Sequence, residues 1–158
     1  MSSYKQQEFD FVNRTQKIIE QYDQLKLEES ENFNVTLLIN CLTGLLILPQ
    51  QHWFTNLPKE IITIKKWGIS VEDISFIKDG ESKNPENIAR HLRNSIAHYN
   101  YKIFSDEEKK LSTIEFLDFT DNTKEKSTFK CNLKIKQLRS FVEKLSNTFK
   151  DEMLKGKS

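Results

Sequence analysis

The sequence contains few of the residues that bind metals or form cross-links. Its 158 residues include two cysteines, three histidines, three prolines and four glycines. Cys41 and Cys131 lie 90 positions apart, a spacing that fits no zinc site and leaves one disulfide formally open. We therefore expect neither a metal nor a cofactor. The scarcity of proline and glycine excludes a linker-rich or disordered chain, and the length predicts one domain over residues 1–158.

A long apolar run is also missing. The longest such stretch, residues 35–48, spans 14 residues, whereas about 20 are needed to cross a bilayer. We interpret it as a buried helix and expect no membrane contact. The first residues are polar and lack the apolar segment of a signal peptide. The expected compartment is the cytoplasm, where both cysteines would pack as reduced thiols.

The net charge is close to zero but unevenly distributed. A total of +1 excludes strong unspecific binding of nucleic acid over the whole surface. Residues 1–34 nevertheless carry a balance of −3, and residues 124–158 carry +6. The basic end can be a solvated lysine-rich surface or a surface that faces a polyanion. In the second interpretation Lys130 and Lys134 contact the polyanion as substrate-binding residues.

Hydrophobic periodicity predicts a mainly α protein. Apolar residues recur at steps of three and four over four segments, which we interpret as helices: 4–27, 30–48, about 58–67 and 135–152. Residues 69–83 are ambiguous between a short helix and a strand followed by a loop. A further helix is expected from Asn84 to about residue 101, because Asn caps a helix, Pro85 fits its first turn and Glu86 complements the helix dipole.

The period changes to two in the last third of the chain. Ile114, Phe116 and, after a slip of one position, Phe119 predict a first strand over about 111–119. Apolar residues then alternate with lysine and asparagine from Phe129 onward. The pattern predicts one antiparallel β-hairpin, residues 111–135, before the last helix. Residues 153–158 are expected to fray.

One helix concentrates the scarce basic residues. Half of the four arginines and two of the three histidines lie within nine residues. On a helix Arg90, Asn94 and His98 share one face, Arg93 lies at its shoulder, and His91 lies well round from His98. Arginine matches phosphate oxygens and histidine exchanges a proton near neutral pH, so the set suits phosphodiester chemistry without a metal. On spacing alone, a purely structural role for these residues stays open.

The stretch HLRNSIAH resembles the signature of the HEPN superfamily, in which an arginine, often followed by a polar residue, precedes a histidine by four to six intervening residues. Here these positions are Arg93, Asn94 and His98. The helix FNVTLLINCLTGLLILPQ and the hairpin with the closing helix resemble a prokaryotic HEPN subgroup found on plasmids and in defence loci. The resemblance covers roughly residues 30–150.

The resemblance implies an up-and-down helical bundle, here with the hairpin inserted before the last helix. It also implies a metal-independent endoribonuclease whose homodimer forms a composite active site. His98 would be the general acid/base acting on a ribose 2′-hydroxyl, Arg93 would stabilise the phosphate, and Asn94 would orient His98 or the substrate. The product would carry a 2′,3′-cyclic phosphate.

Two further residues of this helix are candidates for RNA binding. Arg90 is an additional cation at the expected site, although it is not part of the family pattern. Tyr99 lies on the expected packing face, and its ring could instead stack on a base. The implied role is a toxin or anti-phage effector, with RNA and an antitoxin or defence protein as expected partners. The alternative is a non-catalytic RNA- or nucleotide-binding module, or an interaction subunit of a defence complex.

Overall fold

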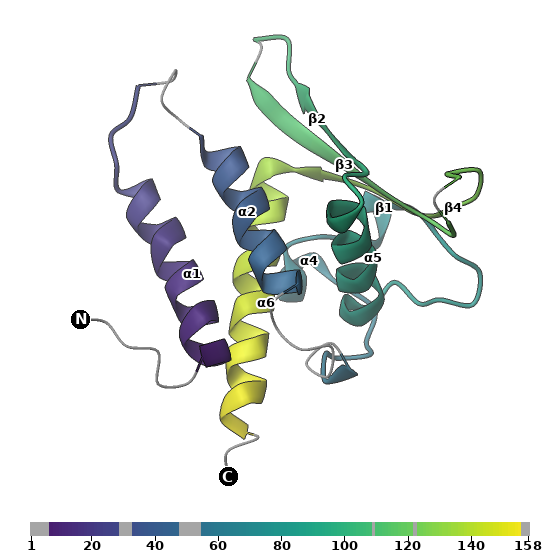
Figure 1. Cartoon of the computed structure of the whole chain (residues 1–158), viewed down its shortest axis with the longest axis horizontal. Helices are drawn as coiled ribbons and strands as arrows, with labels where there is room; N and C mark the ends of the chain where they lie inside the picture. Colours follow the sequence, from purple (N-terminus) through teal and green to yellow (C-terminus); the bar gives the residue numbers. More distant parts are fainter. Residues whose placement is uncertain (1–6, 29–32, 48–54, 109, 122, 156–158) are drawn as a thin grey trace.

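The structure of the protein, a computed structural model, describes residues 7–28, 33–47, 55–108, 110–121 and 123–155. Three consecutive strands lie between the last two helices of the chain (Figure 1). In chain order the elements are α1 (Gln7–Asp23), α2 (Asn34–Ile47), α4 (Ile64–Trp67), a 3₁₀ turn η2 (Val71–Asp73), β1 (Ile74–Ile77), α5 (Pro85–Ala97), β2 (Tyr101–Ser105), β3 (Leu111–Phe119), β4 (Ser127–Lys134) and α6 (Ile135–Lys155).

The four strands form one antiparallel sheet in the order β1-β4-β3-β2. The expected bundle with a single hairpin is therefore wrong: the hairpin of β3 and β4 is the middle of a larger sheet. The two added strands have four and five residues. Their burial does not alternate, because β2 is exposed along most of its length, so period two gives no signal for them.

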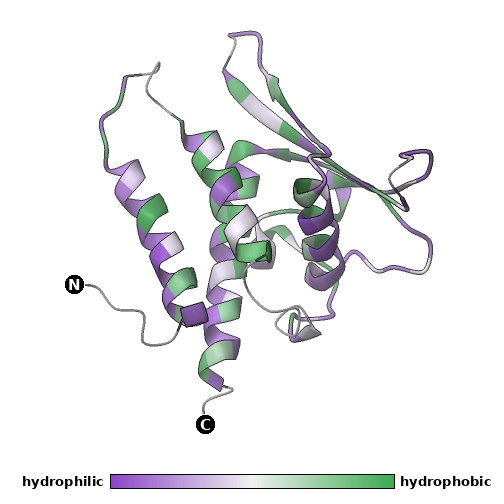
Figure 2. Ribbon diagram, viewed as in Figure 1, coloured by the Kyte–Doolittle hydropathy of each residue, from purple (hydrophilic) through white to green (hydrophobic). Residues whose placement is uncertain are grey.

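α1, α2 and α6 lie side by side (Figure 1). α5 packs against α2 and β3, and α6 also contacts β3 and β4. α2 is buried on several sides, as the sequence predicts. The inward positions of β3 and β4 are fully buried, and so is the apolar stripe of α6. Both cysteines are free and buried. Figure 2 shows that α2 is largely apolar whereas α5 is mostly hydrophilic. No helix among the described residues is both long and apolar enough to cross a bilayer.

The helix expected over about 58–67 is much shorter. It covers only Ile64–Trp67, because Thr63 caps it by accepting from the backbone N–H of Lys66, and Gly68 ends it with a φ of 74°. The ambiguous segment 69–83 holds η2 and β1. α6 extends to Lys155, and the last three residues of the tail expected to fray lie outside the described residues.

α5 begins as the sequence predicts and ends earlier. The Asn84 side chain accepts from the backbone N–H of Asn87 at 2.9 Å, and Pro85 occupies the first turn. At the other end the backbone N–H groups of Tyr99 and Asn100 donate to the carbonyls of Ile96 and Ser95 at 3.0 and 2.7 Å. This is the Schellman pattern, which needs a left-handed residue just after the helix.

Tyr99 takes that left-handed position with a φ of 55°. Glycine is the usual residue at this position. Because the chain has tyrosine there, the usual sequence signal for the end of a helix is missing. The chain leaves α5 at His98 and enters β2 at Tyr101. The site is positioned by this sharp exit, which brings the end of α5 against the end of β3.

Candidate functional site

His98 is the capping residue at the C-terminal end of α5, and its side chain is exposed. It borders a hollow of about 310 Å³ between this helix end and the turn that joins β3 to β4. The hollow is lined by His98, Asn100, Asp118, Phe119, Thr120, Asp121 and Lys124. An exposed imidazole beside a polar hollow is accessible to a substrate and can exchange a proton with it.

Asn94 lies one turn before His98 and connects two other groups. Its Nδ2 donates to Oδ2 of Asp118 at 3.0 Å, and its Oδ1 accepts from Nη2 of Arg93 at 3.3 Å. Both Arg93 and Asn94 are half-buried. The structure therefore brings Arg93 and Asn94 into contact, and Asp118 joins Asn94 to the hollow that His98 borders.

Asp118 is a buried carboxylate on the inward face of β3, where only 5% of the residue is exposed. Its Oδ2 accepts from both Asn94 and Nδ1 of His91, the latter at 2.7 Å, and its Oδ1 accepts from the backbone N–H of Phe119 at 2.9 Å. Burial opposes the ionisation of Asp118, but these hydrogen bonds and the charge of His91 together lower its pKa below the ordinary value. The group is an anion at neutral pH.

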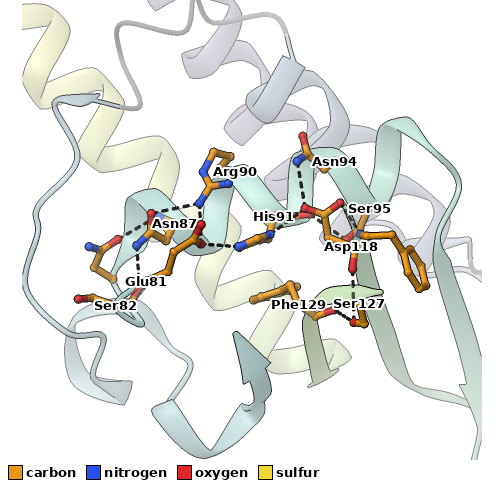
Figure 3. Close-up of polar contacts among 12 residues, drawn as sticks. Glu81, Ser82, Asn87, Arg90, His91, Asn94, Ser95, Asp118, Ser127 and Phe129 are labelled. Atoms are coloured by element: carbon orange, nitrogen blue, oxygen red, sulfur yellow. Dashed lines mark hydrogen bonds and ion pairs between the residues drawn. The ribbon is translucent and has the colours of Figure 1, made fainter. Parts of the chain in front are cut away.

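His91 is buried between two carboxylates (Figure 3). Its Nδ1 faces Asp118, and its Nε2 lies 2.8 Å from Oε2 of Glu81, in the loop before α5. Each ring nitrogen of His91 is therefore within hydrogen-bond distance of one carboxylate oxygen. The ring is also stacked on Phe129, with centroids 4.8 Å apart and planes 5° from parallel.

Arg90 is turned toward Glu81 rather than toward His98. Its Nη2 donates to the same Oε2 of Glu81 at 2.7 Å. Burial opposes the ionisation of Glu81, but the hydrogen bonds from His91 and Arg90 and their charges lower its pKa. The helix face expected to gather Arg90, Asn94 and His98 is thus divided between two carboxylates.

The aromatic and lysine candidates lie apart from this network. Tyr99 is 78% exposed, so its expected packing role is wrong; the left-handed backbone turns it out of the core, where its ring lies 5.0 Å from that of Tyr101. Lys130 lies on the outer face of the sheet and pairs with Glu115 at 2.8 Å. Lys134 is exposed on the same strand. Neither lysine lines the hollow beside His98.

The sequence interpretation missed Glu81 and Asp118. Asp118 had a signal: it occupies the inward position that follows Ile114 and Phe116 at period two. The apparent slip to Phe119 is instead a register irregularity between Asp118 and Phe119. A charged residue at an apolar position of a strand points to a buried, paired charge. Glu81, in a loop, offers no such pattern.

The network is not arranged as a metal site. Within the described residues, no group of three or more His, Cys, Asp or Glu side chains could hold a metal ion. His91 separates Glu81 from Asp118, because each of its ring nitrogens bonds to one of them. The other polar groups of the site are the Arg93 guanidinium, the Asn94 amide and the exposed imidazole of His98.

Comparison with curated proteins and with solved structures gives no match. A family comparison does: the profile of the family described as HEPN pEK499 p136 matches residues 1–155. This match spans nearly the whole chain, including α5 and its Arg93–His98 segment, and it confirms the resemblance to HEPN domains. Membership supports a nucleotide- or RNA-related function. The chain belongs to the HEPN pEK499 p136 family.

Proposed function

We propose that the protein is a metal-independent endoribonuclease that acts as a toxin or anti-phage effector. The observation that carries the proposal is the position of His98, exposed at the end of α5 and bordering the hollow. Arg93 and Asn94 lie on the same helix, hydrogen-bonded to each other. These are the groups that phosphodiester cleavage needs, namely a proton carrier and a cation.

The reaction is a transfer of the phosphoryl group within one nucleotide. A base removes the proton of the ribose 2′-hydroxyl, and the 2′-oxygen attacks the phosphorus. The bond to the 5′-oxygen breaks, and an acid gives that oxygen a proton. The products carry a 2′,3′-cyclic phosphate and a 5′-hydroxyl. One imidazole can serve as the base, and a second serves as the acid.

A homodimer supplies both imidazoles. Among the residues that line the hollow, His98 is the one histidine, and His91 is buried with both nitrogens bonded to carboxylates. We propose that two copies place their His98 side chains at one cleft. The Arg93 guanidinium stabilises the charge that develops on the phosphate, because its planar fork matches two phosphate oxygens.

RNA contacts extend from this centre to Tyr99. Its ring is exposed next to His98, and an exposed aromatic ring stacks on any base. Arg90 is paired with Glu81, and Lys130 with Glu115 on the outer face of the sheet. We assign these two cations no part in the cleavage step.

The test is cleavage of single-stranded and structured RNA in the presence of EDTA. We expect cleavage by the wild type, with cyclic-phosphate ends, and loss of cleavage in His98→Ala, His98→Gln and Arg93→Ala. Arg139→Ala is the matched control, because Arg139 is also half-buried but pairs with Asp23 on α1, away from α5. Equal cleavage by the wild type and His98→Ala, or a metal requirement, contradicts the proposal. Salt-sensitive RNA binding without cleavage supports the non-catalytic alternative instead.

The biological role is tested in cells. Expression of the wild type should arrest growth, and His98→Ala expressed to the same level should not. Light scattering at micromolar concentration checks the homodimer, which a monomer would contradict.

A further inference from the structure

The proposed reaction assigns no step to the hydrogen-bonded cluster of Glu81, His91 and Asp118. Glu81, His91 and Asp118 form a continuous chain of hydrogen bonds that reaches Arg90 at one end and Asn94 at the other (Figure 3). Removing three such groups from water is costly and needs good geometry to be offset. At the Asn94 end the chain of hydrogen bonds continues to Arg93, the preceding residue of the proposed cleavage motif, whose Nη2 donates to Oδ1 of Asn94.

We propose that Asp118 is a positioning residue of the ribonuclease site, which fixes the orientation of the Asn94 amide and, through it, the Arg93 guanidinium. The inference rests on the proposed function for its catalytic consequence. The hydrogen bonds themselves are independent of that function. Asp118 does not touch the reacting atoms in this scheme, although it lines the hollow that His98 borders.

The orientation follows from the donor inventory. An asparagine amide can face a neighbour with either its oxygen or its NH₂ group. An ionised carboxylate only accepts, so Nδ2 of Asn94 must face Asp118, as it does at 3.0 Å. The Oδ1 atom is then directed to the other side, where it accepts from Nη2 of Arg93. If the amide were reversed, NH₂ would face the guanidinium and neither contact would survive.

The Asp118 carboxylate is itself held in place by hydrogen bonds to His91 and to the Phe119 backbone. Its Oδ2 accepts from His91, whose second nitrogen is bonded to Glu81 and whose ring is stacked on Phe129. Its Oδ1 accepts from the Phe119 backbone N–H. Supporting hydrogen bonds of this kind restrict a side chain to one rotamer, and small misplacements of a reacting group cost rate.

A double-mutant cycle separates positioning from simple structural support. The variants are Asp118→Asn, Asn94→Ala and the double variant, compared by kcat, KM and melting temperature. The control is Glu115→Gln, which removes a carboxylate from the opposite face of the same strand. We expect Asp118→Asn to lower kcat roughly 10- to 100-fold and to change KM by less than about 3-fold, with no change in the control.

The decisive comparison is made in the Asn94→Ala background. If Asp118 acts through Asn94, adding Asp118→Asn should reduce kcat by less than about 3-fold there. Equal fold losses in both backgrounds would overturn the inference. So would a loss confined to KM, or a loss of kcat that merely follows the fraction unfolded.

Two further measurements guard against an unfolded variant and an inactive wild type. Asn94→Asp keeps the size of the side chain and faces Asp118 with a second carboxylate, so it should lower kcat as Asp118→Asn does while far-UV circular dichroism is retained. Unchanged kcat would overturn the inference.

If the wild type does not cleave RNA, the proposed function fails, and positioning is tested by NMR. The Asn94 side-chain NH₂ protons, identified by their absence in Asn94→Ala, should exchange with water faster in Asp118→Asn; unchanged exchange overturns the inference.

Discussion

The imidazole of His91 and the ring of Phe129 are stacked in the interior, one from α5 and the other from β4, with centroids 4.8 Å apart. Each ring nitrogen of the imidazole also lies within hydrogen-bond distance of a carboxylate oxygen. A pair of stacked rings contributes about 0.5–1.5 kcal/mol beyond the area that it buries. It attaches α5, the helix of the Arg93–His98 motif, to the centre of the sheet.

Phe129→Leu should therefore destabilise the protein more than Phe116→Leu. Both phenylalanines are fully buried on the inward face of the sheet, so both variants lose apolar contact and leave a cavity. The loss of the stacked ring beneath His91 should add about 1 kcal/mol for Phe129. The measurement is the free energy of unfolding in urea at neutral pH. Equal losses would show that the stacking contributes no specific stability.

Stability should fall at acid pH partly because of Asp118 and Glu81. The pKa of each is lowered in the folded protein, from ordinary values of 3.8 and 4.5. The unfolded chain therefore binds protons first as the pH falls. The contribution of these carboxylates is complete above their ordinary pKa values and is lost as the pH falls through the lowered values.

The measurement is the urea midpoint of the wild type and Asp118→Asn from about pH 6 to about pH 2. The decline should be shallower in Asp118→Asn, since the variant has one fewer carboxylate to protonate. Asp79→Asn, in an exposed loop, is the control for removing one charge. Parallel curves for the wild type and Asp118→Asn would refute the assignment.

Tyr99→Gly should raise stability and weaken RNA binding. Glycine relieves the left-handed backbone at this position, which costs a tyrosine about 1 kcal/mol. The lost ring should weaken binding by about 1–3 kcal/mol for one stacked base. Lys124→Gly, at a φ of 58°, measures the gain in stability at a second left-handed position. It is used only in the unfolding experiment, because Lys124 lines the hollow beside His98. Unfolding in urea and fluorescence anisotropy with labelled RNA give the two values, and undiminished affinity would exclude Tyr99 from the RNA surface.

Gly68→Ala should destabilise the protein strongly, whereas Gly80→Ala should cost only backbone strain. The two glycines have similar φ values of 74° and 82°, so an alanine is strained at either position by about 1 kcal/mol. At Gly68 an added Cβ would collide with the Ser140 side chain of α6, whereas at Gly80 nothing lies within 4 Å. The difference between the two melting temperatures isolates this contact. Equal melting temperatures would mean that α6 moves aside without cost.

Local patterns predicted several elements well. The span of β3, the start of α5 and the buried stripe of α6 follow from alternation, capping and helical period, which act over a few residues. β2 was missed, and β1 was left open between a short helix and a strand, because pairing with β3 and β4, not their own composition, makes them strands. The end of α5 was missed because Tyr99 occupies a position where glycine is expected.

The spacing of Arg93, Asn94 and His98 identified the motif residues. It could not predict which carboxylates bind the side chains of this helix. A helical wheel places Arg90, Asn94 and His98 on one face, yet Glu81 binds Arg90 and Asp118 binds Asn94. Both carboxylates lie outside the helix, and only tertiary packing brings them to it. The same packing makes His91, which the wheel set aside, the centre of the buried network.

Asp118, which binds the Asn94 side chain, is synthesised after the Arg93–His98 motif. Asp118 follows Asn94 by 24 residues, and β4, which holds both β1 and β3, follows Asp118. A nascent chain that ends before β3 contains Arg93, Asn94 and His98 but has neither Asp118 nor the sheet to orient them. Domains complete their folding as their last elements emerge. If the site cleaves RNA as proposed, an incomplete chain on the ribosome should not yet cleave it, because Asp118 and β4 are still missing.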